Sequence, residues 1–471
     1  MIRNKGRKNK EEERMNTPIV DFITAYRENN PVRFHMPGHK GRKQLGPEDW
    51  DITEIYGADS LYEAEGIIAQ SEKNASLLFN SGATFYSTEG SSQCIKAMLY
   101  LMMSKQKRGT ERPYLIAARN AHKSLIHGAA LLDLDILWWY PKERTSLCSA
   151  LVDPEDLEDL LSIRKERPIG VYVTCPDYLG NLLPLCEIAE ICHKYETYLA
   201  VDNAHGAYLH FLNNPCHPLD LGADFCCDSA HKTLPVLTGG AYLHLHKSLG
   251  KEFLGKEKTA LSFFGSTSPS YLTLASLDLC NVYLQSRCKE ELQETIKRAE
   301  ELKEKLRKQG WTLEDTEPLK ITFRINPAKE ENAMDGIHVR EELEKQGIYP
   351  EYGDLDYLVL MITTENTKED FQQLEQALKK IRKEGRAKVK ENSGTYWKIQ
   401  EHEQVLTLRE AAFLPNEEIS AECSVGRICA IPTVSCPPAI PIVVSGERIR
   451  KEDIATFAYY GIKKICVVKE E

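Results

Sequence analysis

Residues 198–206 read Tyr198-Leu199-Ala200-Val201-Asp202-Asn203-Ala204-His205-Gly206, an apolar run that ends in polar side chains. A second run of this kind, residues 224–227, leads directly into Asp228-Ser229-Ala230-His231-Lys232-Thr233. Short apolar runs bounded in this way predict buried strands, and in parallel α/β sheets ligands bind beyond the carboxyl ends of the strands. Each stretch therefore predicts a strand whose end carries candidate binding residues.

The sequence around these stretches alternates between strand-like and helix-like segments from about residue 75 to residue 275. The strand-like runs are residues 114–118, 136–140, 170–174, 198–201 and 241–245, and the helix-length segments include residues 91–104, 154–165 and 184–195. This alternation is typical of βαβ units around a mostly parallel sheet. It predicts an α/β fold.

The rest of the chain predicts an amino-terminal arm and two smaller units. The prolines and glycines of residues 34–42 predict a loop in the arm, whereas residues 271–310 predict a long helical region with a charged, solvated face. A second α/β segment extends to about residue 383, residues 384–391 resemble a linker, and a proline cluster at 436–441 lies in the last unit. The predicted parts are an arm (1–50), a large domain (51–275), a small α/β domain (276–387) and a carboxyl-terminal domain (388–471).

The composition narrows the possible classes of function. The 471 residues carry 60 Lys and Arg against 70 Asp and Glu, and this net charge of −10 argues against nucleic-acid binding as the main role. No apolar signal segment opens the chain, and no run approaches the ~18 apolar residues of a membrane helix. The 14 cysteines include no C-x-x-C pair, so we expect neither a structural metal site nor disulfides, but reduced thiols in a cytoplasmic protein.

Lys232 is the residue of greatest chemical interest in these stretches. Burial disfavours the charge of a lysine and lowers its pKa, which suits Schiff-base chemistry. Spacing alone favours an exposed lysine in a loop. In the same way, Asp202 taken alone could be a helix cap or a metal ligand.

Five short motifs along the chain make the predicted function more specific. They are residues 34–41 (FHMPGHKG), 119–124 (RNAHKS), 202–206 (DNAHG), 229–233 (SAHKT) and 267–272 (TSPSYL). Together they resemble the pyridoxal-phosphate (PLP) enzymes of fold type I, and specifically the short form of the ornithine/lysine/arginine decarboxylase family, over roughly residues 17 to 450. The resemblance implies a three-layer, aspartate aminotransferase-like domain with a mostly parallel sheet, a small α/β domain and a carboxyl-terminal α+β domain.

The resemblance also implies roles for individual residues. Lys232 would hold PLP covalently and return a proton, and Asp202 would keep the pyridine nitrogen protonated. His122 would stack on the ring, with a helix cap or a core position as its alternative. His205 would lie near the phenolic oxygen of the cofactor or the substrate carboxylate, with packing as its alternative.

A phosphate site is predicted at Gly90, Ser91 and Ser92, which precede a helical pattern formed by Ile95, Met98, Leu99 and Met102. The start of such a helix presents free N–H groups to an anion. By the resemblance, Ser229 and His231 assist there. Thr267 and Ser268 would reach the phosphate of a neighbouring subunit, which implies a homodimer or higher homo-oligomer with shared active sites.

The resemblance implies decarboxylation of arginine, lysine or ornithine in polyamine biosynthesis. A basic substrate needs a carboxylate near its distal end, for which Glu351 is the first candidate and Asp354 the second; both could also be surface carboxylates. Another PLP reaction, such as transamination or elimination, and a non-catalytic paralogue are the alternatives.

Three positions depart from the family pattern. Gly239 replaces the usual glutamine after Leu-Thr, Asn203 replaces a common glutamate after the aspartate, and Glu89 replaces asparagine in the phosphate turn. These departures leave Lys232 and Asp202 intact and bear on substrate choice and activity.

Overall fold

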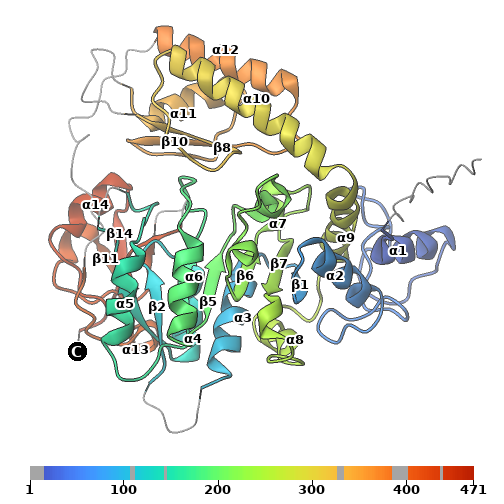
Figure 1. Ribbon diagram of the computed structural model, residues 1–471, viewed down its shortest axis with the longest axis horizontal. Helices are drawn as coiled ribbons and strands as arrows, with labels where there is room; N and C mark the ends of the chain where they lie inside the picture. The colour runs from blue at the N-terminus through green and yellow to red at the C-terminus, as the bar shows by residue number, and fades with distance from the viewer. Residues whose placement is uncertain are drawn as a thin grey trace, which may run out of the picture.

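A seven-stranded sheet forms the centre of the computed structural model, which describes residues 15–106, 112–142, 146–325, 334–384, 401–434 and 439–470 (Figure 1). Its strand order is β1-β7-β6-β5-β4-β2-β3. The strands are β1 (Ala83–Ser87), β2 (Tyr114–Ala118), β3 (Asp135–Trp139), β4 (Val171–Thr174), β5 (Leu199–Asp202), β6 (Phe225–Asp228) and β7 (Ala241–Leu245). Strands β2 to β6 pair in parallel, and β7 and β1 add an antiparallel edge, so the predicted mostly parallel α/β sheet is confirmed.

The strands are mostly apolar because helices cover both faces of the sheet. Successive side chains of a strand point to opposite faces. In β2, Leu115 and Ala117 pack with helices α3 (Ser91–Met103) and α4 (Lys123–Leu132). Ile116 and Ala118 face the other way, toward α5 (Pro154–Ser162) and α6 (Leu185–Lys194). The result is the three-layer arrangement that the sequence predicted.

A helix that the sequence did not predict, α1 (Pro18–Glu28), lies in the amino-terminal arm. Its buried Ile19 and Ile23 join the core formed with α2 (Ile67–Leu78) and α9 (Tyr271–Ser286). The carboxylate of Asp278 on α9 accepts the backbone N–H groups of Ile19 and Val20 at 2.9 and 3.0 Å. Residues 31–50 form no helix or strand, as their prolines and glycines predicted.

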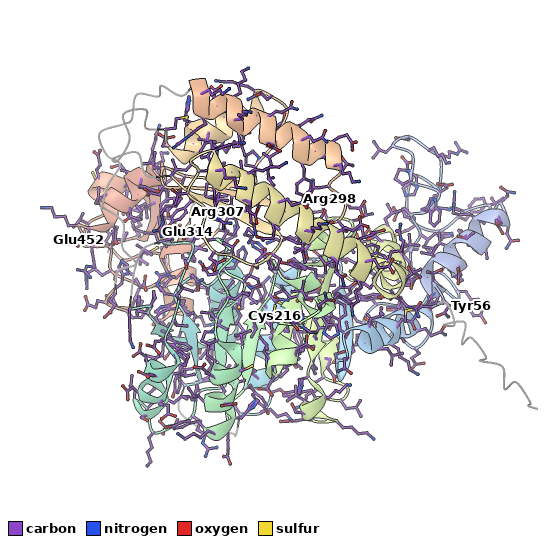
Figure 2. The ribbon with its side chains drawn as sticks, turned by 45° about the horizontal axis from the view of Figure 1, so that its top comes forward. Tyr56, Cys216, Arg298, Arg307, Glu314 and Glu452 are labelled. Carbon is purple, nitrogen blue, oxygen red and sulfur yellow. The ribbon has the colours of Figure 1, made fainter. Side chains whose placement is uncertain are left out.

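The predicted helical region 271–310 is broken at Arg287 into α9 and α10 (Cys288–Lys308). Buried Leu292, Ala299, Leu302 and Leu306 give α10 one apolar face, and Figure 2 shows Arg298 and Arg307 along the same helix. Helix α10 packs against α12 (Lys368–Glu384), which contacts α11 (Gly336–Glu344). The same unit contains a small antiparallel sheet of β8 (Lys320–Arg324), β10 (Tyr357–Met361) and β9 (Tyr352–Gly353). This small domain lies above the large sheet in Figure 1.

The carboxyl-terminal elements lie beside β2 and α5 (Figure 1). They are α13 (Leu408–Phe413), β11 (Asn416–Ser420), β12 (Thr433–Val434), β13 (Pro441–Val443), α14 (Asp453–Tyr459) and β14 (Lys464–Val468). Buried Arg119, just after β2, donates to the carbonyls of Pro441 and Ile442 at 2.8 and 2.9 Å. Lys123 N–H also donates to the Ala439 carbonyl at 3.1 Å. The carboxyl-terminal elements are therefore bonded to the end of β2.

Nearly all of the expected linker at 384–391, and residues 436–438 of the proline cluster, lie outside the described residues. The four domain boundaries stay a prediction. Within the described part of the chain, no helix is both long enough and apolar enough to cross a membrane.

Candidate active site

A cavity of about 420 Å³ opens where β4, β5 and β6 end and α3 begins. The side chains that line it come from the large domain, the small domain and the carboxyl-terminal elements. The predicted site residues among them are Gly90, Ser91, Ser92, His122, Asp202, His205, Ser229, His231, Lys232 and Glu351. The cavity thus brings together residues more than 250 positions apart in the chain.

Lys232 and His205 are in direct contact within this cavity. Lys232 lies on α7 (Ala230–Thr233), a single turn that follows β6, and its Nζ is 2.9 Å from Nε2 of His205. Burial lowers the pKa of Lys232, although the carboxylates of Asp202 and Glu351 oppose that shift. Burial and the nearby Lys232 also hold the pKa of His205 well below its usual range, so this imidazole is neutral. A lysine with a lowered pKa is a better amine nucleophile.

Asp202 ends β5 and is only 3% exposed. Its carboxylate accepts the Tyr172 hydroxyl at 3.1 Å and the Ala204 N–H at 3.2 Å. Burial raises the pKa of Asp202, and the ammonium of Lys232 opposes that rise. A carboxylate held in this way can pair with a protonated ring nitrogen.

His122 is both a helix cap and part of the cavity wall. It is the N-cap of α4, where its Nδ1 accepts the Ser124 N–H at 3.2 Å, and it also lines the cavity. Burial, helped by Lys232, lowers the pKa of His122 to about 4. Its ring is therefore neutral near pH 7 and is available for stacking on a planar ligand.

Hydroxyl groups gather at the amino-terminal end of α3. Gly90, with φ of +69°, turns the chain into the helix, in a conformation that glycine adopts without strain. Ser229 donates to Ser91 at 2.9 Å, and Ser124 donates to Ser92 at 2.8 Å. Free N–H groups and hydroxyls at a helix start form an anion site, which suits a phosphate.

The donor set fits PLP, with an anion site at α3, a buried carboxylate in Asp202 and an amine in Lys232. Asn120, which follows β2, supplies a further observation. It is 2% exposed and lines the cavity, yet neither amide atom has a hydrogen-bond partner among the described residues. Buried amides are normally paired, so Asn120 is free to bond a polar group inside the cavity. The motif at 119–124 contained this residue, but its position after a strand was the only signal for it.

Three predicted residues are not brought to the cavity. Thr267 and Ser268 are exposed just before α9 and do not line it. Asp354 is 6% exposed and bonds within the small domain, to the Tyr352 hydroxyl and the Tyr357 N–H, both at 2.7 Å. The expectation that Asp354 contacts the distal end of a substrate is therefore not supported. Glu351 does line the cavity, where it accepts the Tyr178 hydroxyl at 2.8 Å.

Comparison with known proteins decides the family. The model of the Orn/Lys/Arg decarboxylase major domain matches residues 17–341. The chain belongs to the Orn/Lys/Arg decarboxylase family. Membership confirms the predicted enzyme class, a PLP-dependent amino-acid decarboxylase, and with it the predicted cofactor.

The similarity to individual relatives covers almost the whole chain. The chain is 28% identical over 462 residues to an arginine decarboxylase of Bacillus subtilis, with 93% of this chain and 92% of the relative covered. It is also 28% identical over 469 residues to the uncharacterized protein YaaO of the same organism, with 93% of each covered. The lysine decarboxylase LdcF of Francisella novicida shares the fold, with a TM-score of 0.78 at 18% identity over 96% of this chain and 81% of that one.

The structure accounts for two of the three departures of this decarboxylase from the family pattern. Gly239 has φ of +94°, and a Cβ there would lie 2.6 Å from the Thr88 carbonyl oxygen. The Gly239 carbonyl accepts the Gly90 N–H at 2.8 Å, so this glycine supports the turn before α3. The Asn203 side chain bonds Asp228 and does not line the cavity. The third departure, Glu89, is exposed at the cavity rim.

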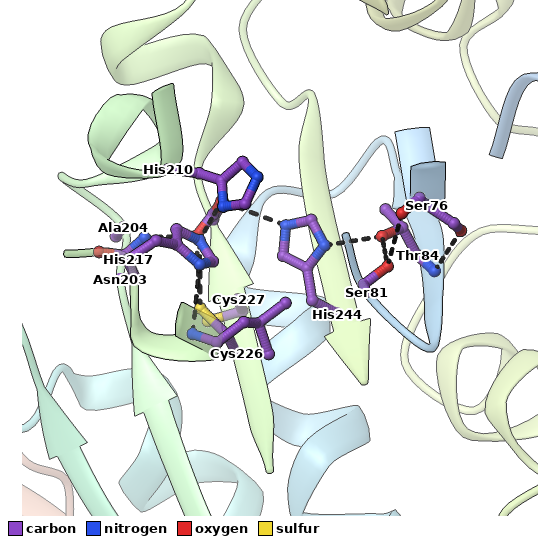
Figure 3. A network of polar contacts seen from close by, with 12 residues as sticks. Ser76, Ser81, Thr84, Asn203, Ala204, His210, His217, Cys226, Cys227 and His244 are labelled. Atoms are coloured by element: carbon purple, nitrogen blue, oxygen red, sulfur yellow. Dashed lines mark hydrogen bonds and ion pairs between the residues drawn. The ribbon is translucent and has the colours of Figure 1, made fainter. Parts of the chain in front are cut away.

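Asn203 belongs to a buried polar network beneath the site of this family member (Figure 3). Its Nδ2 donates to Asp228 Oδ1 at 2.7 Å, and Nε2 of His217 and of His244 lie 3.0 and 3.1 Å from Asp228 Oδ2. Burial alone would raise the pKa of Asp228, but the two imidazoles lower it well below its usual range. The carboxylate is thus ionised and surrounded by donors.

The three residues His217, Asp228 and His244 are close enough to suggest a metal site. However, His217 Nδ1 accepts the Leu219 N–H at 3.3 Å, so the ring nitrogen that carries a proton is Nε2, the atom facing Asp228. A protonated Nε2 donates to the carboxylate and cannot ligate a metal. Hydrogen bonding therefore explains why these three side chains lie close together.

Proposed function

We propose that this decarboxylase removes CO2 from a basic amino acid, with arginine as the first candidate. The observation that carries the proposal is one cavity that joins Lys232, His205 and Asp202 with the carboxylate of Glu351. The first three suit chemistry at the α-carbon, and the fourth suits a cationic side chain. The curated relative named arginine decarboxylase supports arginine over lysine and ornithine.

PLP, when bound, supplies an electron sink for the charge left on the α-carbon after CO2 departs. Lys232 would hold the cofactor through its Nζ and afterwards return a proton to the α-carbon. Asp202 would keep a proton on the ring nitrogen. His122 would stack on the ring, and Ser91 and Ser92 would hold the phosphate with the N–H groups of α3.

Glu351 is proposed to bind the distal cation of the substrate. Tyr178 already bonds this carboxylate, which limits the positions that its side chain adopts. A guanidinium offers paired N–H groups that match a carboxylate in two parallel hydrogen bonds, whereas an ammonium cannot form both at once. Arginine therefore makes the fullest use of Glu351.

A screen of amino acids with added PLP tests the function. CO2 and the product amine are both measured, with Lys232→Ala as the inactive control and the exposed Lys247→Ala as the matched active control. Amine and CO2 from arginine, lost only in Lys232→Ala, support the proposal. Keto acid without CO2 would favour transamination instead.

We also propose that the enzyme is a homodimer or higher homo-oligomer with shared active sites, acting in polyamine biosynthesis. Exposed Thr267 and Ser268, the exposed apolar Phe34 of the arm and exposed Tyr56 just after it support a partner subunit. Mixing Lys232→Ala with the double variant of Thr267 and Ser268 to alanine tests this. If sites are shared, about a quarter of wild-type activity returns, because half of the dimers are mixed and each has one intact site.

A further inference from the structure

Lys320 is a buried lysine that contacts the site without lining its cavity. It is the first residue of β8 in the small domain and is 0% exposed. Its Nζ lies 2.9 Å from Nδ1 of His205, while Nε2 of the same ring lies 2.9 Å from Nζ of Lys232. One imidazole therefore joins two lysine side chains from different domains.

Among the described residues, two of the three hydrogen-bond partners of the Lys320 amine are carbonyl oxygens, which can only accept. Besides His205 Nδ1, Nζ bonds the carbonyl oxygens of Asp177 at 3.4 Å and Tyr178 at 3.3 Å. Burial lowers the pKa of Lys320, and the carboxylates of Glu317 and Asp177 oppose that shift. As an ammonium it has three N–H donors and no acceptor, so it can bond both carbonyls and His205 only by donating. Lys320 accordingly donates to Nδ1.

The direction of this bond determines where the proton of His205 lies. A neutral imidazole carries one proton, and when Nδ1 accepts a hydrogen bond the proton is on Nε2. Nε2 is the atom that faces Lys232. The ring is further held by Tyr178, whose own ring centroid is 5.2 Å away.

We propose that Lys320 is a positioning residue that keeps His205 neutral and directs its Nε2–H toward the nitrogen of Lys232. It acts only through His205. A catalytic role for Lys320 rests on the proposed function. The position of the proton on His205 does not, because it follows from the hydrogen bonds of the protein alone. Since Lys320 belongs to β8, the tautomer of His205 depends on the small domain being docked over the sheet.

Lys320→Met tests the proposal, because it keeps the length of the side chain and removes the charge and all donors. Lys320→Arg keeps both and is the rescue variant. The matched control is Lys303→Met: Lys303 is 4% exposed on α10, bonds Glu300 and the Pro318 carbonyl, and does not touch the site.

Two measurements test the effect of these substitutions on His205 and Lys232. Hydrogen–deuterium exchange at the C2–H of His205, followed by mass spectrometry in cofactor-free protein, reports the pKa of its ring. A pH titration of the visible absorption band reports the protonation of the Lys232 nitrogen in the PLP-loaded enzyme. In Lys320→Met, loss of a positive neighbour should raise the pKa of His205 by about one unit or more and shift the absorption midpoint. Lys320→Arg should restore both values, and Lys303→Met should change neither.

Unchanged midpoints in a folded Lys320→Met would overturn the proposal. If that variant does not fold, the wild type still decides: C2–H exchange should report a neutral His205 from pH 5 to 9, and a midpoint near the ordinary histidine pKa of about 6.5 would contradict the assignment. Failure of the proposed function is distinct, since it would appear as an absence of CO2 from any basic amino acid while the Lys320 shifts persist.

Discussion

Asn203 Nδ2 donates a 2.7 Å hydrogen bond to Oδ1 of Asp228, and both side chains are 0% exposed. Asn203 directly follows Asp202, so the network of Figure 3 supports the backbone that carries the predicted cofactor carboxylate. A glutamate at this position, as is common in the family pattern, would direct a second carboxylate at ionised Asp228. The departure at Asn203 therefore fits its buried partner.

Asn203→Asp should destabilise the enzyme, because two buried carboxylates would face each other and one would have to be protonated. We expect a loss of about 2–4 kcal/mol in the free energy of unfolding, measured with urea at pH 7. Asn214→Asp, on an exposed loop, is the matched control and should cost less than about 0.5 kcal/mol. Equal stability of the two variants would contradict the assigned contact.

Gly239→Ala should weaken the turn that precedes α3. Its φ is +94°, and the new Cβ would lie 2.6 Å from the Thr88 carbonyl, so both strain and steric overlap arise. Gly255→Ala is the control, because its φ is +81° but a Cβ there meets nothing within 4 Å. We expect Gly239→Ala to cost about 1–2 kcal/mol more than Gly255→Ala and to release PLP more readily, as equilibrium dialysis would measure. Identical PLP retention would show that Gly239 does not support the phosphate turn.

Glu351→Gln should raise the KM for arginine by about tenfold or more while kcat changes less, since a charge-assisted hydrogen bond to the distal cation is lost. Asp354→Asn is the paired control. Asp354 bonds its own domain and does not line the cavity, so that variant should lose stability and keep its KM. Steady-state kinetics with arginine separates the two, and a KM effect confined to Asp354→Asn would reverse the assignment.

His122 should make the cofactor-free protein less stable in acid. Burial lowers its folded pKa to about 4, so below the unfolded value of 6.5 the unfolded chain binds the extra proton. The stability due to neutral His122 is thus present above pH 6.5 and is lost as the pH falls toward 4, by about 1–3 kcal/mol. His122→Asn keeps an N-cap side chain and should flatten this part of the stability curve. Parallel curves for the two proteins would refute the assigned shift.

The sequence predicted the strands of the large domain except β1, and ten of the residues that line the cavity, because both depend on local patterns. Buried parallel strands are continuous apolar runs, and the residues after them share one edge of the sheet. Helix α1 was missed because its apolar face is short and is stabilised by distant Asp278.

The remaining site residues could not be predicted, because only tertiary contacts bring them to the site. Lys320 is one lysine among many in the sequence, and only the docking of β8 brings it to His205. Glu351 and Asp354 are three positions apart, and no periodicity distinguishes them. The structure explains Asp354, because its carboxylate bonds the N–H groups two and three residues later, as aspartates in turns commonly do.

The bonds from Arg119 and Lys123 to Pro441, Ile442 and Ala439 bear on how this enzyme can be dissected. The family model ends at residue 341, yet Glu351, Ala439 and Ile440 form part of the cavity wall. A fragment that ended at residue 341 would retain Lys232 and Asp202 but would lack one side of the cavity. The smallest autonomous catalyst in this chain is consequently larger than the segment by which its family is recognised.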